Sequence, residues 1–307
     1  MSNITLKQLK VFTAITQHKT LTASSEKLFL SKAAVSLSLS ELEKQIGHAL
    51  FDRVNNRLIL NEEGKRLLPL ADELLHRSQD ISNMFQDEQA LNGQLKIGAS
   101  DTIGNQVVPF LLRDFREKTH HEQQSLFISN SSLICEKLYD YELDIGLIEG
   151  KTQSNQLLMQ PWNQDEMCII CSPEHPLAKS ATKGKAIRIM ELENSQWLLR
   201  EAGSGSREFF LRTIAPRIEI WEEAFQLNTT EAIINATAAN LGLACLSRLA
   251  AESALYDGRV VTIDVPLDMK RRFWLLVHKE KYQSPLLKTF MQFCSDWKML
   301  DSLQSRR

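Results

Sequence analysis

The stretch from Thr22 to Arg53 reads TASSEKLFLSKAAVSLSLSELEKQIGHALFDR. It predicts a short helix, a tight break at Phe29 and Leu30, and a second helix that starts at Ser31. A serine suits that position because its hydroxyl accepts a hydrogen bond from a free backbone N–H at a helix start. The apolar positions of the second helix recur at helical spacing and are Val35, Leu39, Leu42 and Ile46. The stretch is therefore expected to form two packed helices.

The opposite face of the second helix carries small, hydroxylated and basic side chains. They are Lys32, Ala33, Ser36, Leu37, Ser40 and Lys44. Such a face suits a helix in a DNA major groove, because bulky side chains would hold the helix away and lysines can meet phosphates. Taken alone, the helix leaves an ordinary surface helix open as the alternative.

The segments on either side complete a known arrangement. An apolar stripe predicts a first helix over Leu6–His18, and two short extended segments flank Asn55-Asn56, residues that tolerate a tight turn. The order helix, helix, helix, wing predicts a winged helix-turn-helix DNA-binding domain over residues 1–60. Arg53 and Arg57, at the wing, are expected to contact phosphates or the minor groove.

A long helix follows, with Asn61 as its cap and acidic residues in its first turn. Residues 62–88 would span roughly 40 Å as a helix. Its apolar seam comprises Leu67, Leu70, Leu74, Ile81, Met84 and Leu91, with Leu75 and Phe85 beside it. We expect residues 61–91 to pair with the same helix of a second subunit, giving a homodimer or homotetramer. Packing onto its own domain is the alternative.

From Gln94 onward, strand and helix patterns alternate. The expected strands include LKIGAS, SLFIS, LDIGLIEG, MCIIC, WLLR, EEAFQL, LACLS and FWLLVHKE, with helices near Gly104–Lys118 and Pro285–Leu300. This alternation predicts an α/β domain of about 215 residues with parallel sheets. That size allows two lobes.

Polar clusters follow several of these strands and lead into helices. They are Ser100-Asp101-Thr102, Asn130-Ser131-Ser132, Gly203-Ser204-Gly205-Ser206 and Asn228-Thr229-Thr230. Helix starts with free N–H groups suit an anion, and Arg200 or Arg207 could add a charge-assisted bond. Each cluster alone is more often a simple helix cap, so only the recurrence favours a ligand. The candidate effector-binding residues are Ser100, Thr102, Asn130, Ser131, Glu149, Gly203, Ser204 and Thr229, of which Glu149 would repel an anion.

Composition bounds the class of protein. The 307 residues are 43% hydrophobic and 24% charged, and the net charge of −2 combines +4 over residues 1–66 with −6 elsewhere. A basic head on an acidic body is typical of a nucleic-acid-binding module joined to another domain. No apolar run reaches the roughly 18 residues of a membrane span, and the first residues lack a signal peptide, so we expect a cytosolic protein without a membrane partner.

The spacing reveals no catalytic set and no cofactor motif. Cys168 and Cys171 have metal or redox spacing, but residues three apart in a strand point to opposite faces. The Gly203-x-Gly205 pair lacks a full dinucleotide fingerprint. We therefore predict neither a metal site nor an enzyme.

The chain resembles the LysR-type transcriptional regulators over essentially its whole length. The head positions that carry the resemblance are Ser31, Ala34-Val35-Ser36, Leu39, Leu42-Glu43, Gly47, Leu50-Phe51 and Arg53, and the body positions are Leu143–Leu147 and His175–Ala178. The phrases SDTIGN, GLIEG, REAGSGSRE and TEAI are most similar to the YeiE-like branch. Ser24-Ser25 and Lys32-Ala33 depart from the usual residues, which leaves open whether Lys32 reads guanine or contacts phosphate.

The resemblance implies a ligand-responsive regulator of transcription. It implies paired winged heads on double-stranded DNA, RNA polymerase as a further partner, and a body like a periplasmic binding protein. The body would comprise residues 92–307, with lobe I over 92–162 and 267–307 and lobe II over 163–266. The YeiE-like branch suggests a small anionic effector between the lobes, such as sulfite or a carboxylate.

Two alternatives from other classes stay open. An enzyme with an accessory DNA-binding head would turn over a small anion, with Glu149 as the first acid/base candidate. A constitutive DNA-bending protein would have a ligand-blind body, and its thermal stability would not respond to oxyanions or carboxylates.

Overall fold

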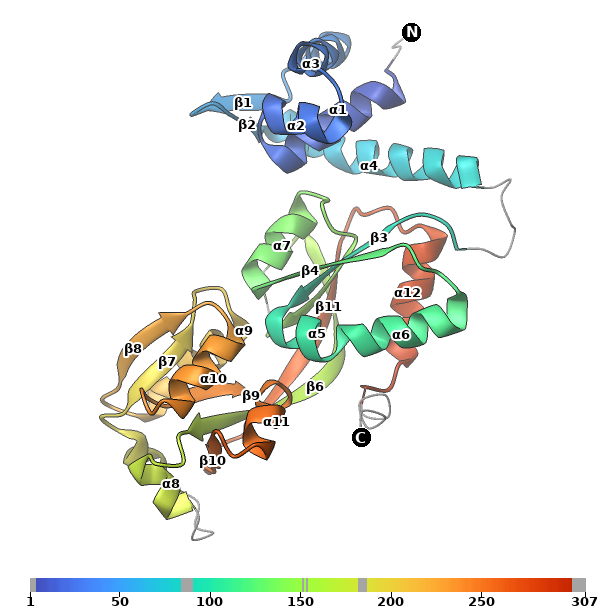
Figure 1. Ribbon diagram of the computed structural model, residues 1–307. Coiled ribbons are helices and arrows are strands. Elements are labelled where there is room, and N and C mark those ends of the chain that lie inside the picture. The colour runs from blue at the N-terminus through green and yellow to red at the C-terminus, as the bar shows by residue number, and fades with distance from the viewer. Residues whose placement is uncertain (1–3, 84–90, 151, 153, 182–186, 300–307) are drawn as a thin grey trace.

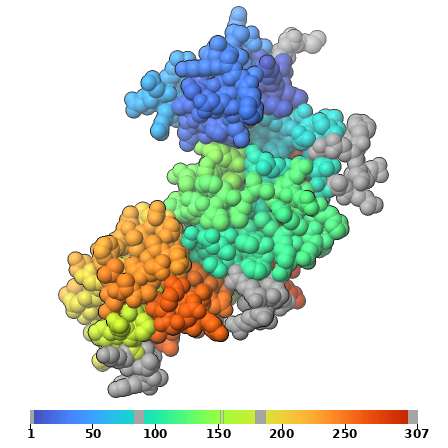
Figure 2. All heavy atoms as spheres, viewed as in Figure 1, coloured from blue at the N-terminus to red at the C-terminus, as the bar shows by residue number. Residues whose placement is uncertain are grey.

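The structure is a computed structural model that describes residues 4–83, 91–150, 152, 154–181 and 187–299. A small head lies above a long helix, and both lie above a body of two lobes (Figure 1). The space-filling view shows the head seated on lobe I, with lobe II projecting to one side (Figure 2). Within the described ranges, no helix combines the length and apolar character that a bilayer crossing needs.

The head is a winged helix-turn-helix, as the sequence predicts. Its elements are α1 (Leu6–His18), α2 (Leu21–Leu28), α3 (Lys32–Ile46), β1 (Phe51–Val54) and β2 (Arg57–Leu60). The hydroxyl of Ser31 accepts from the backbone N–H of Ala34 at 3.1 Å and so starts α3. Phe29 takes a left-handed conformation, with φ of 54°, which turns the chain sharply between α2 and α3.

Local polar groups shape the rest of the head. Asn55 and Asn56 both have positive φ, the geometry of a two-residue hairpin turn between β1 and β2. Ser24 is fully buried, and its hydroxyl donates to the carbonyl oxygen of Thr20 at 2.7 Å. The departure at Ser24 therefore costs no unpaired polar group.

The long helix α4 (Glu62–Asn83) presents different faces to different neighbours. Asn61 caps it by accepting from the N–H of Gly64 at 2.9 Å. Leu68 and Ala71 are buried in the head core, whereas Leu70, Leu74 and Ile81 are 58%, 50% and 64% exposed. Met84 of the predicted seam and Phe85 beside it lie outside the described residues. Leu91, the last residue of that seam, packs against the core of lobe I instead.

The body is an α/β structure in which each lobe has its own hydrophobic clusters. Lobe I contains β3 (Leu95–Ser100), α5 (Asp101–Gln106), α6 (Val108–Thr119), β4 (Gln124–Ser129), α7 (Ser131–Tyr139), β5 (Ile145–Glu149) and α12 (Pro285–Asp296). Lobe II contains α8 (Pro176–Ala181), η1 (Ile189–Leu192), β7 (Gln196–Arg200), α9 (Gly205–Thr213), η2 (Ala215–Arg217), β8 (Glu222–Leu227), α10 (Thr230–Ala238), β9 (Ala244–Ser247), α11 (Arg248–Tyr256) and β10 (Val261–Ile263).

The expectation of parallel sheets is only partly right. β3 pairs in parallel with β4 and β5, and β7 pairs in parallel with β8. Two long strands, β6 (Leu157–Cys171) and β11 (Lys270–His278), are antiparallel to their neighbours and run from one lobe into the other. The main sheet is therefore mixed, with strand order β10-β6-β11-β5-β3-β4 and β9 beside β6. The helix expected over Gly104–Lys118 is two helices, α5 and α6.

The lobes approach each other too closely for side chains at two glycines. A Cβ on Gly205 would lie 2.6 Å from Cβ of Glu149, and one on Gly203 would lie 2.6 Å from Oγ of Ser132. The backbone N–H of Ser132 donates across the same boundary to the carbonyl oxygen of Gly203 at 3.3 Å. The glycine-serine turn is thus a point of direct contact between lobes.

Arg271 of β11 ties the two lobes together. Its Nη1 lies 2.7 Å from Oε2 of Glu149 at the end of β5, and its Nε lies 3.1 Å from Oδ2 of Asp165 in β6. Nη1 also donates to the hydroxyl of Ser206 in α9 at 3.3 Å. The Arg271 side chain is 1% exposed, so both ion pairs are shielded from water.

We expect Arg271→Met to lower the free energy of unfolding by about 3–5 kcal/mol, because two buried carboxylates lose their cation. Urea denaturation of the full chain measures the change. Arg272→Met is the matched control: its side chain is exposed, so its effect should stay within about 0.5 kcal/mol. Equal effects of the two substitutions would contradict a stabilising role for the buried pairs.

Candidate nucleic-acid interface and interlobe site

The outward face of α3 carries the predicted groove-facing residues. Val35, Leu39 and Leu42 are buried in the head core. The opposite side chains remain accessible: Lys32, Ala33, Leu37 and Ser40 are exposed and Ser36 is half-buried. α3 therefore presents the small, basic surface that the sequence predicts for contact with a major groove.

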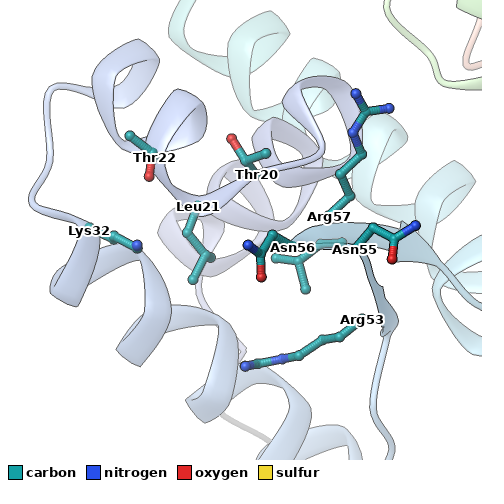
Figure 3. A pocket seen from close by; sticks show the side chains of 9 residues that line it. Thr20, Leu21, Thr22, Lys32, Arg53, Asn55, Asn56 and Arg57 are labelled. Carbon is teal, nitrogen blue, oxygen red and sulfur yellow. The ribbon is translucent and has the colours of Figure 1, made fainter.

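A hollow of about 800 Å³ separates α3 from the wing. It is lined by Thr20, Leu21, Thr22, Lys32, Arg53, Asn55, Asn56, Arg57 and Leu58. Lys32 and Arg53 extend into it from opposite sides, while Arg57 points away from Arg53 (Figure 3). Among the described residues, none of these three cations forms a salt bridge. The arrangement suits a polyanionic backbone.

The sequence prediction missed four polar residues of this hollow. Thr20 and Thr22 lie at the start of α2, and Asn55 and Asn56 form the wing turn. Thr20 could have been found as a helix cap, since its hydroxyl accepts from the N–H of Ala23 at 3.2 Å. Nothing in the sequence shows that α2 and the wing turn border one hollow.

Most of the predicted effector-binding residues meet where the lobes face each other. Thr102 donates its backbone N–H to Oε1 of Glu149 at 2.9 Å, and the Ser131 hydroxyl donates to the Glu149 carbonyl oxygen at 3.3 Å. Asn130 reaches across the boundary and donates Nδ2–H to Oε1 of Glu201 at 3.2 Å. Ser204 begins α9 and is buried beside the contacting glycines.

Ser100 and Thr229 behave differently from each other. The Ser100 hydroxyl is buried and has no hydrogen-bond partner among the described residues. Thr229 is exposed and serves as a cap, accepting from the N–H of Ala232 at 3.2 Å. Its neighbour Thr230 is buried and donates its hydroxyl to Oδ2 of Asp101 in the other lobe. The residue that contacts lobe I is therefore one position after the predicted Thr229.

Arg200, at the end of β7, links lobe II to lobe I. Its Nη1 lies 3.0 Å from Oδ2 of Asp101 in lobe I and donates to the Thr230 hydroxyl at 3.1 Å. Its Nε and Nη2 bind the two carboxylate oxygens of Glu201 at 2.8 and 3.1 Å. Burial opposes the charged form, but Glu201 and Asp101 raise the pKa of Arg200 above its usual range. Arg207, the other arginine candidate, pairs instead with Glu223.

A second buried ion cluster joins α4 to lobe I. Nζ of Lys281 lies 2.9 Å from Oδ1 of Asp72 in α4 and 2.8 Å from Oδ1 of Asp144 in the body. The Tyr282 hydroxyl donates to Oδ2 of Asp80 at 3.1 Å, and Lys19 of the head pairs with Asp140. Head and long helix are thus positioned by the body.

The cysteines make no metal or redox site in the described part of the chain. Cys168 and Cys171 are both buried within β6, and burial raises the pKa of their thiols to about 12 and about 11. High pKa values keep thiols protonated and unreactive. No group of three potential ligands that could hold a metal ion occurs among the described residues.

Family models match nearly the entire chain. Residues 6–65 match the bacterial regulatory helix-turn-helix protein, lysR family, and residues 88–298 match the LysR substrate binding domain. The chain is 36% identical over 293 residues to the HTH-type transcriptional regulator YeiE of Escherichia coli, covering 95% of this chain and 97% of that protein.

Solved structures of similar proteins share the fold. A full-length OxyR variant from Pseudomonas aeruginosa superimposes with a TM-score of 0.72 at 21% identity, covering 99% of this chain and 96% of that one. The regulatory domain of CcmR from Synechocystis, solved in complex with 2-PG, has a TM-score of 0.59 at 24% identity and covers 66% of this chain and 96% of that one.

We expect Lys32→Ala and Arg53→Ala each to weaken binding to duplex DNA. A plot of log affinity against log salt concentration should lose about 0.9 of its slope for each phosphate contact removed. If Lys32 also reads a base, Lys32→Ala alone should relax the sequences recovered by selection from random duplexes. Lys270→Ala, an exposed substitution in the body, is the control. Unchanged slopes in both head variants would contradict the interface.

Proposed function

The chain belongs to the LysR family of bacterial regulatory helix-turn-helix proteins, and we propose that a small anionic effector held between its lobes controls its DNA binding. As a member of that family it is a DNA-binding transcriptional regulator with an effector-binding domain. We assign sequence recognition to residues 1–60, subunit pairing to residues 61–91 and effector binding to residues 92–307. In this scheme lobe I comprises 92–162 and 267–307, and lobe II comprises 163–266.

The observation that carries the effector proposal is Arg200 at the lobe boundary. The Arg200 side chain is 4% exposed, and its guanidinium faces lobe I and lies beside the hydroxyl of Thr230. A buried guanidinium beside a hydroxyl binds a carboxylate or oxyanion well. The close approach at Gly203 and Gly205 favours a compact ligand. We therefore propose a sulfur oxyanion such as sulfite, or a small carboxylate, as the effector, and the CcmR domain solved with 2-PG supports small effectors in this fold.

The head–body contacts supply a route from effector to DNA. A ligand changes DNA binding only if it favours one lobe or subunit arrangement over another. Because Lys281 holds α4 against lobe I, movement of lobe I would carry α4 and the head with it. We propose that effector binding changes the spacing of paired heads in this way.

The enzyme alternative gains no support from Glu149. Its side chain is 3% exposed, and its carboxylate is bound by Arg271 and by the N–H of Thr102. A carboxylate held in this way has no free oxygen directed at a substrate. We therefore propose a regulator without catalysis. We also propose that it is cytosolic and that it contacts RNA polymerase when it is bound at a promoter.

The effector proposal is tested by thermal shift with sulfite, sulfate, thiosulfate, formate and acetate, followed by DNA binding with each compound that stabilises the protein. We expect Ser100→Ala and Thr102→Ala to weaken binding of the stabilising anion and to leave DNA binding without that anion unchanged. Ser253→Ala, on the surface of α11, is the control.

Two outcomes would count against the effector proposal. No stabilisation of the wild-type protein by any anion would remove the effector role. Loss of folding in the Ser100 and Thr102 variants would favour a packing role for these two buried residues, since the Ser100 side chain makes no capping bond to α5.

Pairing of the protein through α4 is tested by Leu74→Asp. Leu74 lies on the exposed apolar face with Leu70 and Ile81, and a charge there would enter any helix–helix seam. Light scattering after size exclusion should show a smaller assembly, with weaker binding to DNA that carries two half-sites. Tyr256→Asp, which changes another exposed apolar side chain in lobe II, should leave the assembly intact. An unchanged mass for Leu74→Asp would argue against this interface.

A further inference from the structure

The lobe boundary contains more negative than positive charge. The interlobe ion network consists of Asp101, Glu149, Asp165, Glu201, Arg200 and Arg271. It therefore holds four carboxylates and two guanidiniums. A free anion that entered this network without displacing a carboxylate would meet net repulsion, because both guanidiniums already have partners. An anionic ligand must take the place of one of the four.

The four carboxylates are not equally replaceable. The side chains of Glu149 and Asp165 are 3% and 0% exposed and share Arg271, so each is enclosed. Glu201 follows Arg200 in the chain and binds it through both oxygens within the same lobe. Asp101 is 21% exposed and comes from the opposite lobe. It reaches Arg200 and Thr230 through one oxygen, Oδ2.

We propose that the carboxylate of Asp101 is a resident anion. It occupies the effector's binding site on Arg200 and Thr230, the Arg200–Thr230 site, until the effector replaces it. This inference rests on the proposed anionic effector. Nη1 of Arg200 and the Thr230 hydroxyl would bind the incoming carboxylate or oxyanion as they bind Oδ2 of Asp101. Ser100 directly precedes Asp101 in the chain, and its buried hydroxyl has no hydrogen-bond partner among the described residues.

The exchange has a structural consequence. Asp101 belongs to lobe I, whereas Arg200 and Thr230 belong to lobe II, so displacement of Asp101 removes a bond between lobes. The Arg271 pairs remain, because none of them involves Asp101. Effector binding would therefore loosen one side of the lobe boundary around a retained ion cluster. Competition with Asp101 also lowers the apparent affinity for the effector, since only the fraction of molecules with a vacated Arg200 can bind.

The test is chemical rescue of Asp101→Ala by formate and sulfite, measured by thermal shift and calorimetry on the full chain. Without added anion we expect the variant to melt below the wild type. Either anion should raise its melting temperature by more than it raises that of the wild type. Removal of the internal competitor should also tighten anion binding on the order of tenfold. Asp101→Asn, similar in size and uncharged, should bind anions more tightly as well and replaces Asp101→Ala if that variant does not fold.

Glu223→Ala is the matched control. Glu223 binds Arg207 through both carboxylate oxygens at 2.8 Å. Arg207 contacts the network only through the backbone carbonyl oxygen of Arg200, at 3.0 Å, so removal of Glu223 vacates an arginine outside the Arg200–Thr230 site. Formate should raise the melting temperature of this variant by less than that of Asp101→Ala, because Arg207 is 18% exposed and Arg200 only 4%, so water screens Arg207 more. If formate and sulfite act equally on wild type, Asp101→Ala and Glu223→Ala, the resident-anion proposal is overturned.

The outcome separates this inference from the effector proposal. Rescue of Asp101→Ala, together with no effect of any anion on wild-type DNA binding, supports anion binding at the Arg200–Thr230 site and rejects the effector role. Conversely, an anion that binds the wild type and changes its DNA affinity, yet binds the Asp101 variants no more tightly, supports the effector role and rejects the resident anion.

Discussion

Burial of Arg271 between Glu149 and Asp165 is the constraint on which the body depends. An arginine in β11, where that strand passes between lobes, must keep its charge, so burial demands carboxylates within reach. Those carboxylates come from β5 and β6, and Ser206 of α9 completes the contact from lobe II. Removal of a charge from water is costly, and that cost is offset only while all three elements keep their positions. The lobe boundary is therefore set by charge as well as by packing.

The other contacts between parts of the chain lie on either side of that boundary or of lobe I. The glycines at 203 and 205 let the backbones of the two lobes touch, and Arg200 with Asp101 closes the more accessible side. On the far side of lobe I, Lys281 makes a similar contact: this buried cation binds one carboxylate from α4 and one from the body. Two buried cations thus join three parts of the chain: Arg271 joins the two lobes, and Lys281 joins α4 to lobe I. Because lobe I takes part in both contacts, a ligand that moved the lobes would also shift the contact between lobe I and α4.

Sequence reasoning succeeded where local rules decide structure. Ser31, Asn61 and the Asn55-Asn56 pair predicted the start of α3, the start of α4 and the wing turn, because caps and tight turns depend on residues a few positions apart. It failed where partners are remote. The first half of β6 lacks a clear apolar alternation because most of its residues are exposed or half-buried, and its partner β11 lies more than a hundred residues away. The helix α11 and the strand β10 were not predicted either.

By itself the sequence determined the winged head, the long helix, the α/β class of the body and the polar clusters that follow its strands, since each depends on periodicity or on a local cap. Only the tertiary structure decided which polar groups meet. It turned Glu149 from an unexplained carboxylate into the partner of Arg271, brought Thr230 rather than Thr229 to the boundary, and placed Asp101 on Arg200. Ion pairs between residues about a hundred positions apart leave no local pattern, because the fold alone sets their distance and their dielectric surroundings.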